Sequence, residues 1–93
     1  MNTNIQVTDV KVFPLKNKDS KVKAMAHVIL NNCFRITGLK VVEGINGLFI
    51  GWPAEKGKDG NYHEIFKPTN RTGVDLLQDV ILREYDHAKS VAA

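Results

Sequence analysis

Three lysines are the residues of this chain whose spacing points most clearly to a binding chemistry. Lys21, Lys23 and Lys40 lie in two neighbouring β-prone segments, and a tight turn between the segments would place Lys23 opposite Lys40, with Lys21 one pair beyond. Like charges directly opposite each other cost stability, so we expect a polyanion to bind there and relieve the repulsion. The alternative is that the three lysines are solvated and guard a sheet surface or edge.

Three further cations form the margin of this candidate phosphate-binding patch. Lys56 and Lys58 lie in a charged loop over residues 55–60, whose acidic residues equally allow an exposed loop of balanced charge. Arg71 is the only cation near a predicted helix start. Phosphate contacts give affinity and base-edge contacts give specificity, and the sequence identifies no base-reading residue. The candidate nucleic-acid-binding residues are therefore Lys21, Lys23, Lys40, Lys56, Lys58 and Arg71.

Catalysis and metal binding find little support in the sequence. Cys33 and His27 come nearest to a nucleophile and a base, but the predicted hairpin register points them to opposite faces of the sheet. His27, His63 and His87 fall on three different elements without metal-ligand spacing. The glycine-flanked segment 44–53 lacks the lysine and hydroxyl of a phosphate-cradling loop. We therefore expect no enzymatic activity, no cofactor, no metal and no small-molecule substrate.

A central hairpin is the element that would position the lysines. Apolar residues alternate strictly with more polar ones from Val22 to Leu30, Asn31-Asn32 supplies two residues that tolerate positive φ, and a second β-prone run follows from Cys33 to Val42. This pattern predicts a two-residue turn in which Leu30 faces Cys33. A bulge at Gly38 would break that register before Lys40 is reached.

Other strands are predicted on both sides of the hairpin. Between Ile5 and Leu15 the apolar alternation changes phase near Asp9, which predicts a strand with a bulge. The almost wholly apolar run from Gly44 to Pro53 predicts a short buried strand. Asp59-Gly60 favours a tight turn, and a short strand is expected from Tyr62 to Phe66.

A helix is predicted from about Thr72 to Lys89, with Asn70 or Thr72 as its cap and Asp75 in its first turn. Its opposite face is mixed in charge and offers no phosphate-binding stripe. One helix across an antiparallel sheet with a central hairpin is an α+β architecture. The apolar stripe of the helix consists of Leu77, Val80, Ile81, Tyr85 and Ala88.

Length and composition limit the chain to one domain. Residues 5–89 are expected to form it, with residues 1–4 as a flexible leader and 90–93 as a flexible tail. A chain of 93 residues buries only about 60 to 65% of its unfolded surface, which favours a homodimer. The formal net charge of +3 permits an anionic partner without demanding one. One cysteine, no signal peptide and no long apolar span indicate a cytoplasmic protein without a membrane partner.

Several segments, in order, resemble the SpoVG family of small bacterial regulators. The resemblance implies a cytoplasmic dimer that binds DNA, and in some members RNA, and modulates gene expression; the family name comes from roles in sporulation and septation. The segments that carry it are Val7-Thr8-Asp9-Val10, Lys21-Val22-Lys23, Asn46-Gly47-Leu48-Phe49, Pro53, Asp59-Gly60, Pro68, Asn70 and Gln78-Asp79 through Glu84-Tyr85.

The chain departs from this family at two places. Ala54-Glu55 stands where members commonly have basic residues, and Gly73-Val74-Asp75-Leu76 stands where they often have a basic stretch implicated in choosing the DNA sequence. We therefore expect nucleic-acid binding with weak sequence discrimination. The first alternative is a protein-interaction module of the same fold without nucleic-acid binding. A second, a small hydrolase, would require a polar constellation that the sequence does not contain.

Overall fold

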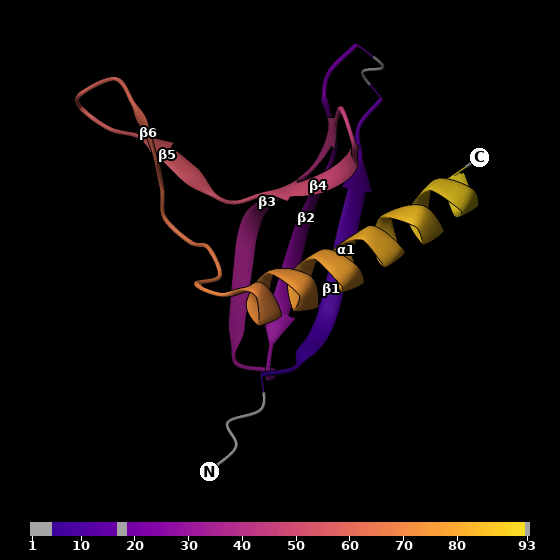
Figure 1. The fold of residues 1–93 in the computed structure, drawn as a ribbon. Coiled ribbons are helices and arrows are strands. Elements are labelled where there is room, and N and C mark those ends of the chain that lie inside the picture. The colour runs from indigo at the N-terminus through magenta and orange to yellow at the C-terminus, as the bar shows by residue number, and fades with distance from the viewer. Residues whose placement is uncertain (1–4, 17–18, 93) are drawn as a thin grey trace.

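A four-stranded antiparallel sheet with one helix across it forms the body of the molecule, and a separate two-stranded hairpin projects from it (Figure 1). The computed structural model describes residues 5–16 and 19–92; the predicted leader 1–4 and the last residue of the predicted tail lie outside the described residues. The predicted α+β class, with its central hairpin and single C-terminal helix, is confirmed. The elements are β1 (Val7–Pro14), β2 (Val22–Leu30), β3 (Phe34–Gly44), β4 (Gly47–Gly51), β5 (Ala54–Lys56), β6 (Tyr62–Glu64) and α1 (Arg71–Ala92).

The predicted bulge in the first strand is confirmed. Val7 pairs with Leu30 and Asp9 pairs with Ile29, so that Thr8 is the extra residue on β1. The Thr8 hydroxyl accepts a hydrogen bond from the Asn32 amide at 2.9 Å and lies 3.2 Å from the Ile29 carbonyl oxygen, to which it donates. These bonds occupy polar groups that the regular ladder would otherwise leave unpaired.

The hairpin between β2 and β3 exists as predicted, but its register is displaced by one residue. Asn31 and Asn32 have φ of 50° and 53°, and the Cys33 amide donates to the Leu30 carbonyl at 2.9 Å, which closes the tight turn. Leu30 nevertheless pairs with Phe34, because Cys33 remains in the loop as an extra residue. The predicted pairing of Leu30 with Cys33 is therefore wrong.

A second displacement occurs at Gly38, as the alternative reading of the sequence allowed. Val28 pairs with Ile36 while Ala26 pairs with Leu39, so two residues of β3 occupy the space of one. Gly38 adopts φ +82°, a conformation that L side chains rarely take. Beyond this bulge Lys40 pairs with Met25, and the predicted direct opposition of Lys23 and Lys40 is wrong.

The hydrophobic core lies between one face of the sheet and α1. From the helix, Leu77, Ile81 and Tyr85 are buried, which confirms the centre of the predicted stripe, and Val80 packs against them. From the sheet, the buried residues are Ala24, Ala26, Val28, Leu39, Val41 and Ile50. Burial of each leucine, isoleucine or valine side chain of this core contributes about 1.5 to 3 kcal/mol to stability. Packing of α1 against this face of the sheet therefore buries these side chains and stabilises the fold.

Asn70 caps the helix, which confirms the first of the two predicted caps. Its side-chain oxygen accepts from the Gly73 amide at 2.9 Å, and its carbonyl accepts from Val74 at 3.2 Å. The helix starts at Arg71 and runs to Ala92, so Asp75 lies outside its first turn, contrary to the prediction. Asp75 instead forms an ion pair with Arg71 one turn earlier, at 3.0 Å.

The strand β4 is not the buried strand that its apolar sequence predicts. Within residues 5–16 and 19–92 it is the last strand of the sheet and pairs with β3 alone, so its outer edge has no neighbour there. Ile50 alone is buried, while Leu48 and Phe49 are exposed to 36% and 45%. Composition does not reveal that this strand lies at the edge of the sheet or that Phe49 points away from the helix-side core.

The β5–β6 hairpin forms an arm that extends away from the sheet and α1 (Figure 1). The predicted turn at Asp59-Gly60 is confirmed: the Gly60 amide donates to the Gly57 carbonyl at 3.0 Å. The Asn61 amide donates to the Asp59 carboxylate, and this bond, followed by the contact with His63, lowers the pKa of Asp59 below its ordinary value of 3.8. The predicted strand from Tyr62 to Phe66 is shorter, and part of the predicted loop forms β5.

Candidate nucleic-acid interface

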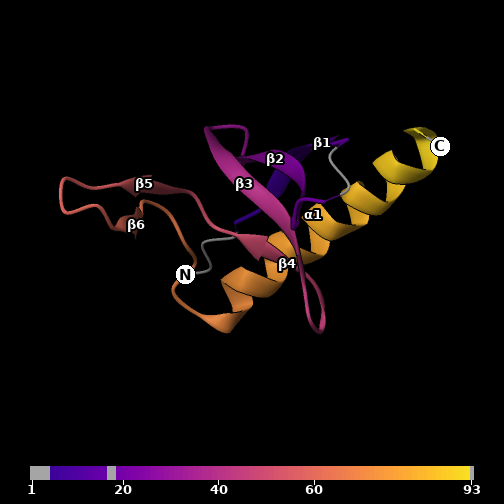
Figure 2. The ribbon, with the colours of Figure 1, turned by 90° about the horizontal axis from the view of Figure 1, so that it is seen from above.

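The face of the sheet that turns away from α1 is the candidate interface. Figure 2 shows the helix on one side of the sheet, and among the described residues no helix or strand packs on the other side. Cross-strand partners share a face, and alternate residues of a strand share a face, so the pairing assigns the side chains there. We call this surface the open face; it comprises Asp9, Lys11, Phe13, Lys23, Met25, His27, Ile29, Arg35, Lys40, Val42 and Phe49.

Basic side chains outnumber acidic ones on the open face. Lys11 on β1 and both Arg35 and Lys40 on β3 are exposed, and Lys23 on β2 keeps 21% of its side chain exposed. The acidic member is Asp9, and Glu43 approaches Lys23 at the margin, with 3.8 Å between Nζ and Oε1. Exposed cations that remain solvated attract phosphates without a desolvation cost comparable to that of buried charges.

Lys40 occupies the middle of the open face. Phe13 pairs with Met25, Met25 with Lys40, and Lys40 with Gly51, so these four residues form one row across all four strands. Lys23 lies two residues before Met25 on β2, at a further irregularity of the pairing between Val22 and Ala24. The two central lysines of the predicted patch therefore share a face without standing opposite each other.

Sequence reasoning missed two cations of this surface. Lys11 pairs with His27, and Arg35 pairs with Ile29, which places both cations on the open face. A register in which Leu30 faces Cys33 implies that Arg35 stands opposite Val28 on the other face, because it lacks the extra loop residue. The alternation of the first strand around Lys11 was the available signal.

The remaining predicted residues lie away from the centre of the open face. Lys21 lies at the end of the sheet, where its carbonyl accepts from the Glu43 amide at 2.8 Å, and it lines a shallow hollow beside the β3–β4 turn. Lys56 and Lys58 are exposed on the arm. Arg71 lies at the start of α1, on the other side of the sheet, in its ion pair with Asp75. The structure thus unites Lys23 and Lys40 and separates the other four.

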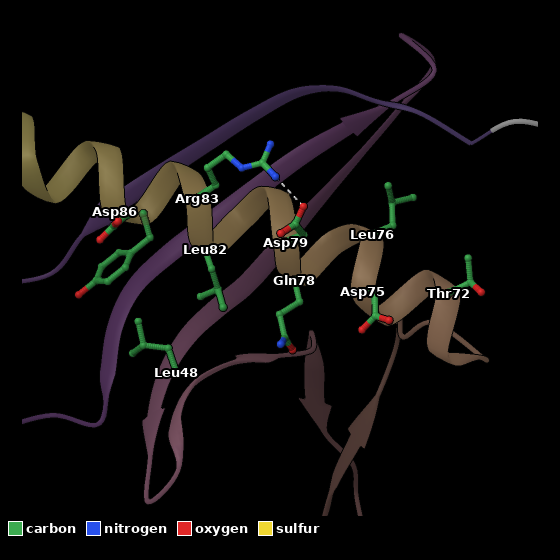
Figure 3. A pocket seen from close by; sticks show the side chains of 10 residues that line it. Leu48, Thr72, Asp75, Leu76, Gln78, Asp79, Leu82, Arg83 and Asp86 are labelled. Atoms are coloured by element: carbon green, nitrogen blue, oxygen red, sulfur yellow. Dashed lines mark hydrogen bonds and ion pairs between the residues drawn. The ribbon is translucent and has the colours of Figure 1, made fainter.

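A groove between α1 and β4 is different in character (Figure 3). Its volume is about 770 Å³, and Leu48 of β4 and Leu82 of the helix contribute apolar lining. Acidic side chains line its helix side, and Asp79 accepts from Arg83 at 2.7 Å. The excess of carboxylates makes this groove unsuited to a phosphate backbone.

Other chemistry finds no constellation in the described part of the chain. Cys33 is exposed in the hairpin loop, while the ring of His27 lies against Phe13 on the open face. No three His, Cys, Asp or Glu side chains of residues 5–16 and 19–92 are grouped so that they could hold a metal ion. Over the same ranges, no helix combines the length and apolar character needed to cross a membrane.

Comparisons with known proteins identify the relatives of this chain. A protein of Myxococcus xanthus is 44% identical over 82 residues, which cover 88% of this chain and 81% of that protein. A protein of Thermoanaerobacter pseudethanolicus is 40% identical over 89 residues, which cover 96% of each chain. Both relatives carry the name "Putative septation protein SpoVG". The sequence model of the SpoVG family matches residues 5–87, and the chain therefore belongs to the SpoVG family, as its sequence motifs predicted.

Proposed function

We propose that this protein is a non-enzymatic, cytoplasmic regulator that binds DNA or RNA through the phosphate backbone. It would modulate gene expression in septation or a sporulation-type process; the relatives' name, "Putative septation protein SpoVG", supports the link to septation. The observation that carries the proposal is the open face, where, among the residues that the structure describes, four cations accompany one acidic residue and no helix or strand packs over them.

The arrangement of charge suits a polymer better than a single anion. Lys11, Lys40 and Arg35 lie on two strands and are spread along the open face rather than gathered around one point. A phosphate backbone carries charges at regular intervals, so it can contact several of these cations at once and release their counterions. A small anion would contact one cation at a time and gain little in solution.

We expect the cations to contribute unequally to nucleic-acid affinity. Lys23 and Lys40 form the centre of the interface, supported by Lys11 and Arg35 on the same face. Lys21, Lys56 and Lys58 can reach a longer ligand that runs past the end of the sheet or along the arm. Arg71 contributes least, because Asp75 already compensates its charge at 3.0 Å.

Fluorescence anisotropy of labelled oligonucleotides, titrated with the protein at a series of salt concentrations, tests the proposal. We expect binding whose logarithm of affinity falls linearly with the logarithm of salt concentration, for single-stranded and duplex probes alike. Absence of binding to every probe at low salt would exclude the proposal. It would favour the alternative of a protein-interaction module.

We also propose that the protein is a homodimer and that the groove between α1 and β4 takes the second copy. The apolar lining from Leu48, Leu76 and Leu82 and the unpaired edge of β4 offer surface that association would bury. The rim carries both signs of charge, so Arg83 of one copy can face Asp79 of the other across a two-fold axis. This groove and the open face lie on different sides of the sheet, and both can be occupied together.

Light scattering at micromolar concentration tests the dimer. The expected mass is twice the 10.4 kDa of the chain. Replacing Leu48, which is 36% exposed, by Lys should give a folded monomer, because it places a charge in the groove without entering the core. A wild-type monomer at that concentration would exclude the dimer, and a dimer that Leu48→Lys leaves intact would exclude this interface.

A further inference from the structure

Two phenylalanine side chains on the open face have no part in phosphate binding. Phe13 of β1 is 50% exposed and Phe49 of β4 is 45% exposed. The helix-side core does not include either residue. Exposed aromatic side chains among solvated cations are typical of surfaces on which nucleic-acid bases stack.

Both rings are held in place by their neighbours. The Phe13 ring lies edge-on to the His27 ring, with 5.4 Å between centroids and 62° between planes. The Phe49 ring lies over Gly44, where a Cβ atom would come within 2.8 Å of Cε1 of that ring. A ring that is already positioned loses little conformational freedom when a base stacks on it.

The spacing of the two rings suits one extended strand. Phe13 lies on the first strand of the sheet and Phe49 on the last, three strand spacings apart, which is about 14 Å. Lys40 lies between them, in the same row as Phe13. A single strand that crosses the sheet can therefore place a base on each ring and a phosphate on Lys40.

We infer that the open face binds single-stranded nucleic acid, with one base stacked on Phe13 and another on Phe49. The inference rests on the proposed function and adds the form of the ligand and the residues that contact its bases. In a duplex the faces of the bases are covered by their neighbours in the stack, so the rings can act only on unpaired nucleotides. Duplex DNA would still reach the lysines through its phosphates.

Anisotropy at one fixed salt concentration tests the inference with a labelled oligothymidylate of about 12 nucleotides, a length within the range that one small domain occupies. A duplex of the same length is the comparison. We expect tighter binding of the single strand and a loss of about 5- to 150-fold for Phe13→Leu and for Phe49→Leu. The duplex affinity and the salt dependence should not change, because no cation is removed.

Two further variants separate stacking from general damage to the surface. Phe34→Leu removes a ring that is 68% exposed but pairs with Leu30, away from the open face, and should leave binding unchanged. Gly44→Ala keeps the Phe49 ring but displaces it, because the new Cβ atom would lie 2.8 Å from Cε1 and 3.2 Å from Cδ1 of that ring. We expect this variant to weaken single-strand binding, with a thermal melt to verify that it is folded. Phe13→Tyr and Phe49→Tyr keep an aromatic face and should bind the single strand with an affinity close to that of the wild type.

The outcomes distinguish this inference from the function on which it rests. If both probes bind and neither Phe13→Leu nor Phe49→Leu weakens the single strand selectively, stacking is refuted while phosphate binding stands. If the duplex binds as tightly as the single strand, the preference for unpaired bases is refuted. If neither probe binds the wild type, the proposed function fails together with the inference.

Discussion

Replacing Lys23 and Lys40 together by Ser should flatten the salt dependence of nucleic-acid binding. Both lysines lie on the open face, and neither is part of the buried core. Lys40 is exposed and Lys23 is partly buried, and neither substitution creates a cavity in the core, so the double variant should fold. The change in binding can then be assigned to the loss of two cations.

The expected magnitude follows from the number of cations on the face. If Lys11, Lys23, Arg35 and Lys40 each contact one phosphate of a single strand, the slope of log affinity against log salt is about −2.8, and removal of two contacts leaves about −1.4. Between about 50 and 200 mM salt the wild type would lose roughly 50-fold in affinity, and the double variant only roughly 7-fold. A difference of this size is readily measured.

A control variant must lower the net charge by the same two units at positions outside the open face. Lys67 lies 3.3 Å from Glu64 just before α1, and Lys89 lies over the Tyr85 ring in the last turn of the helix. The Lys67→Ser, Lys89→Ser variant therefore loses two cations from the side of the sheet that carries the helix. Anisotropy titrations over the same salt series should give it the wild-type slope, and thermal melts should verify that all three proteins are folded.

Two results would refute this reasoning. An unchanged slope in the folded Lys23→Ser, Lys40→Ser variant would show that the open face makes no phosphate contact through these lysines. An equal flattening in the Lys67→Ser, Lys89→Ser control would show that binding follows the net charge of the molecule rather than a defined surface.

Four more predictions follow from individual contacts. Glu43→Gln should raise nucleic-acid affinity in the same titration, because the carboxylate beside Lys23 at 3.8 Å repels phosphates; an unchanged affinity would place Lys23 outside the interface. Gly38→Val should lower the free energy of unfolding, measured by urea denaturation, by about 1 to 2 kcal/mol, since an L side chain is strained at φ +82°. An unchanged free energy of unfolding would contradict the idea that the bulge requires glycine. In the folded protein the pKa of Asp59 is below its ordinary value of 3.8. The ionised carboxylate therefore contributes its full stabilisation of the arm above pH 3.8, and this contribution is lost as the pH falls through the lowered pKa. An NMR titration of the Asp59 carboxyl carbon checks the direction of the shift. Selection from a random oligonucleotide pool at near-physiological salt should yield no sharply defined motif, and a preference beyond the roughly 1 to 3 kcal/mol of one base-pair contact would reveal a base reader not identified among these residues.

The sequence predicts well those features that depend on a few adjacent residues. The change of phase in the apolar alternation near Asp9 predicts the β1 bulge, because an extra residue in one strand shifts the side chains that follow it to the opposite faces. The apolar spacing of the helix predicts that Leu77 and Ile81 are buried, and Asn70 is recognisable as a cap because its side chain replaces the missing acceptor of the first turn. Each of these is a local property of the chain.

The register of the hairpin could not be predicted in the same way. The turn at Asn31-Asn32 has the expected backbone conformation, yet whether Cys33 joins the ladder or stays in the loop depends on the packing of both strands. A slip of one residue sends every side chain of one strand to the other face. For this reason Arg35 was predicted on the wrong face, and the cations of the open face could not all be identified before the strands were paired.

The position of a strand within its sheet is also non-local. The run Leu48-Phe49-Ile50 is apolar enough for a central strand, and only the order β1-β2-β3-β4 shows that it lies at the edge. Its register with β3 places Phe49 beside Val42 on the open face, while Leu48 lines the groove at this edge. Both the stacking surface and the proposed dimer contact therefore depend on a feature that composition conceals.

The distribution of charge between the two sides of the sheet bears directly on what kind of nucleic-acid binding this chain can perform. On the helix side, Arg71 pairs with Asp75 and Arg83 pairs with Asp79, so the start of α1 has little net charge to offer a phosphate or a guanine edge. On the open face the cations outnumber the acids, and the exposed rings are phenylalanines, which have no hydrogen-bonding groups. A surface of lysines and phenylalanines favours phosphates and base faces of any sequence, because neither interaction depends on the identity of the base. The weak sequence discrimination expected from the altered helix start is thus also the behaviour expected from the open face.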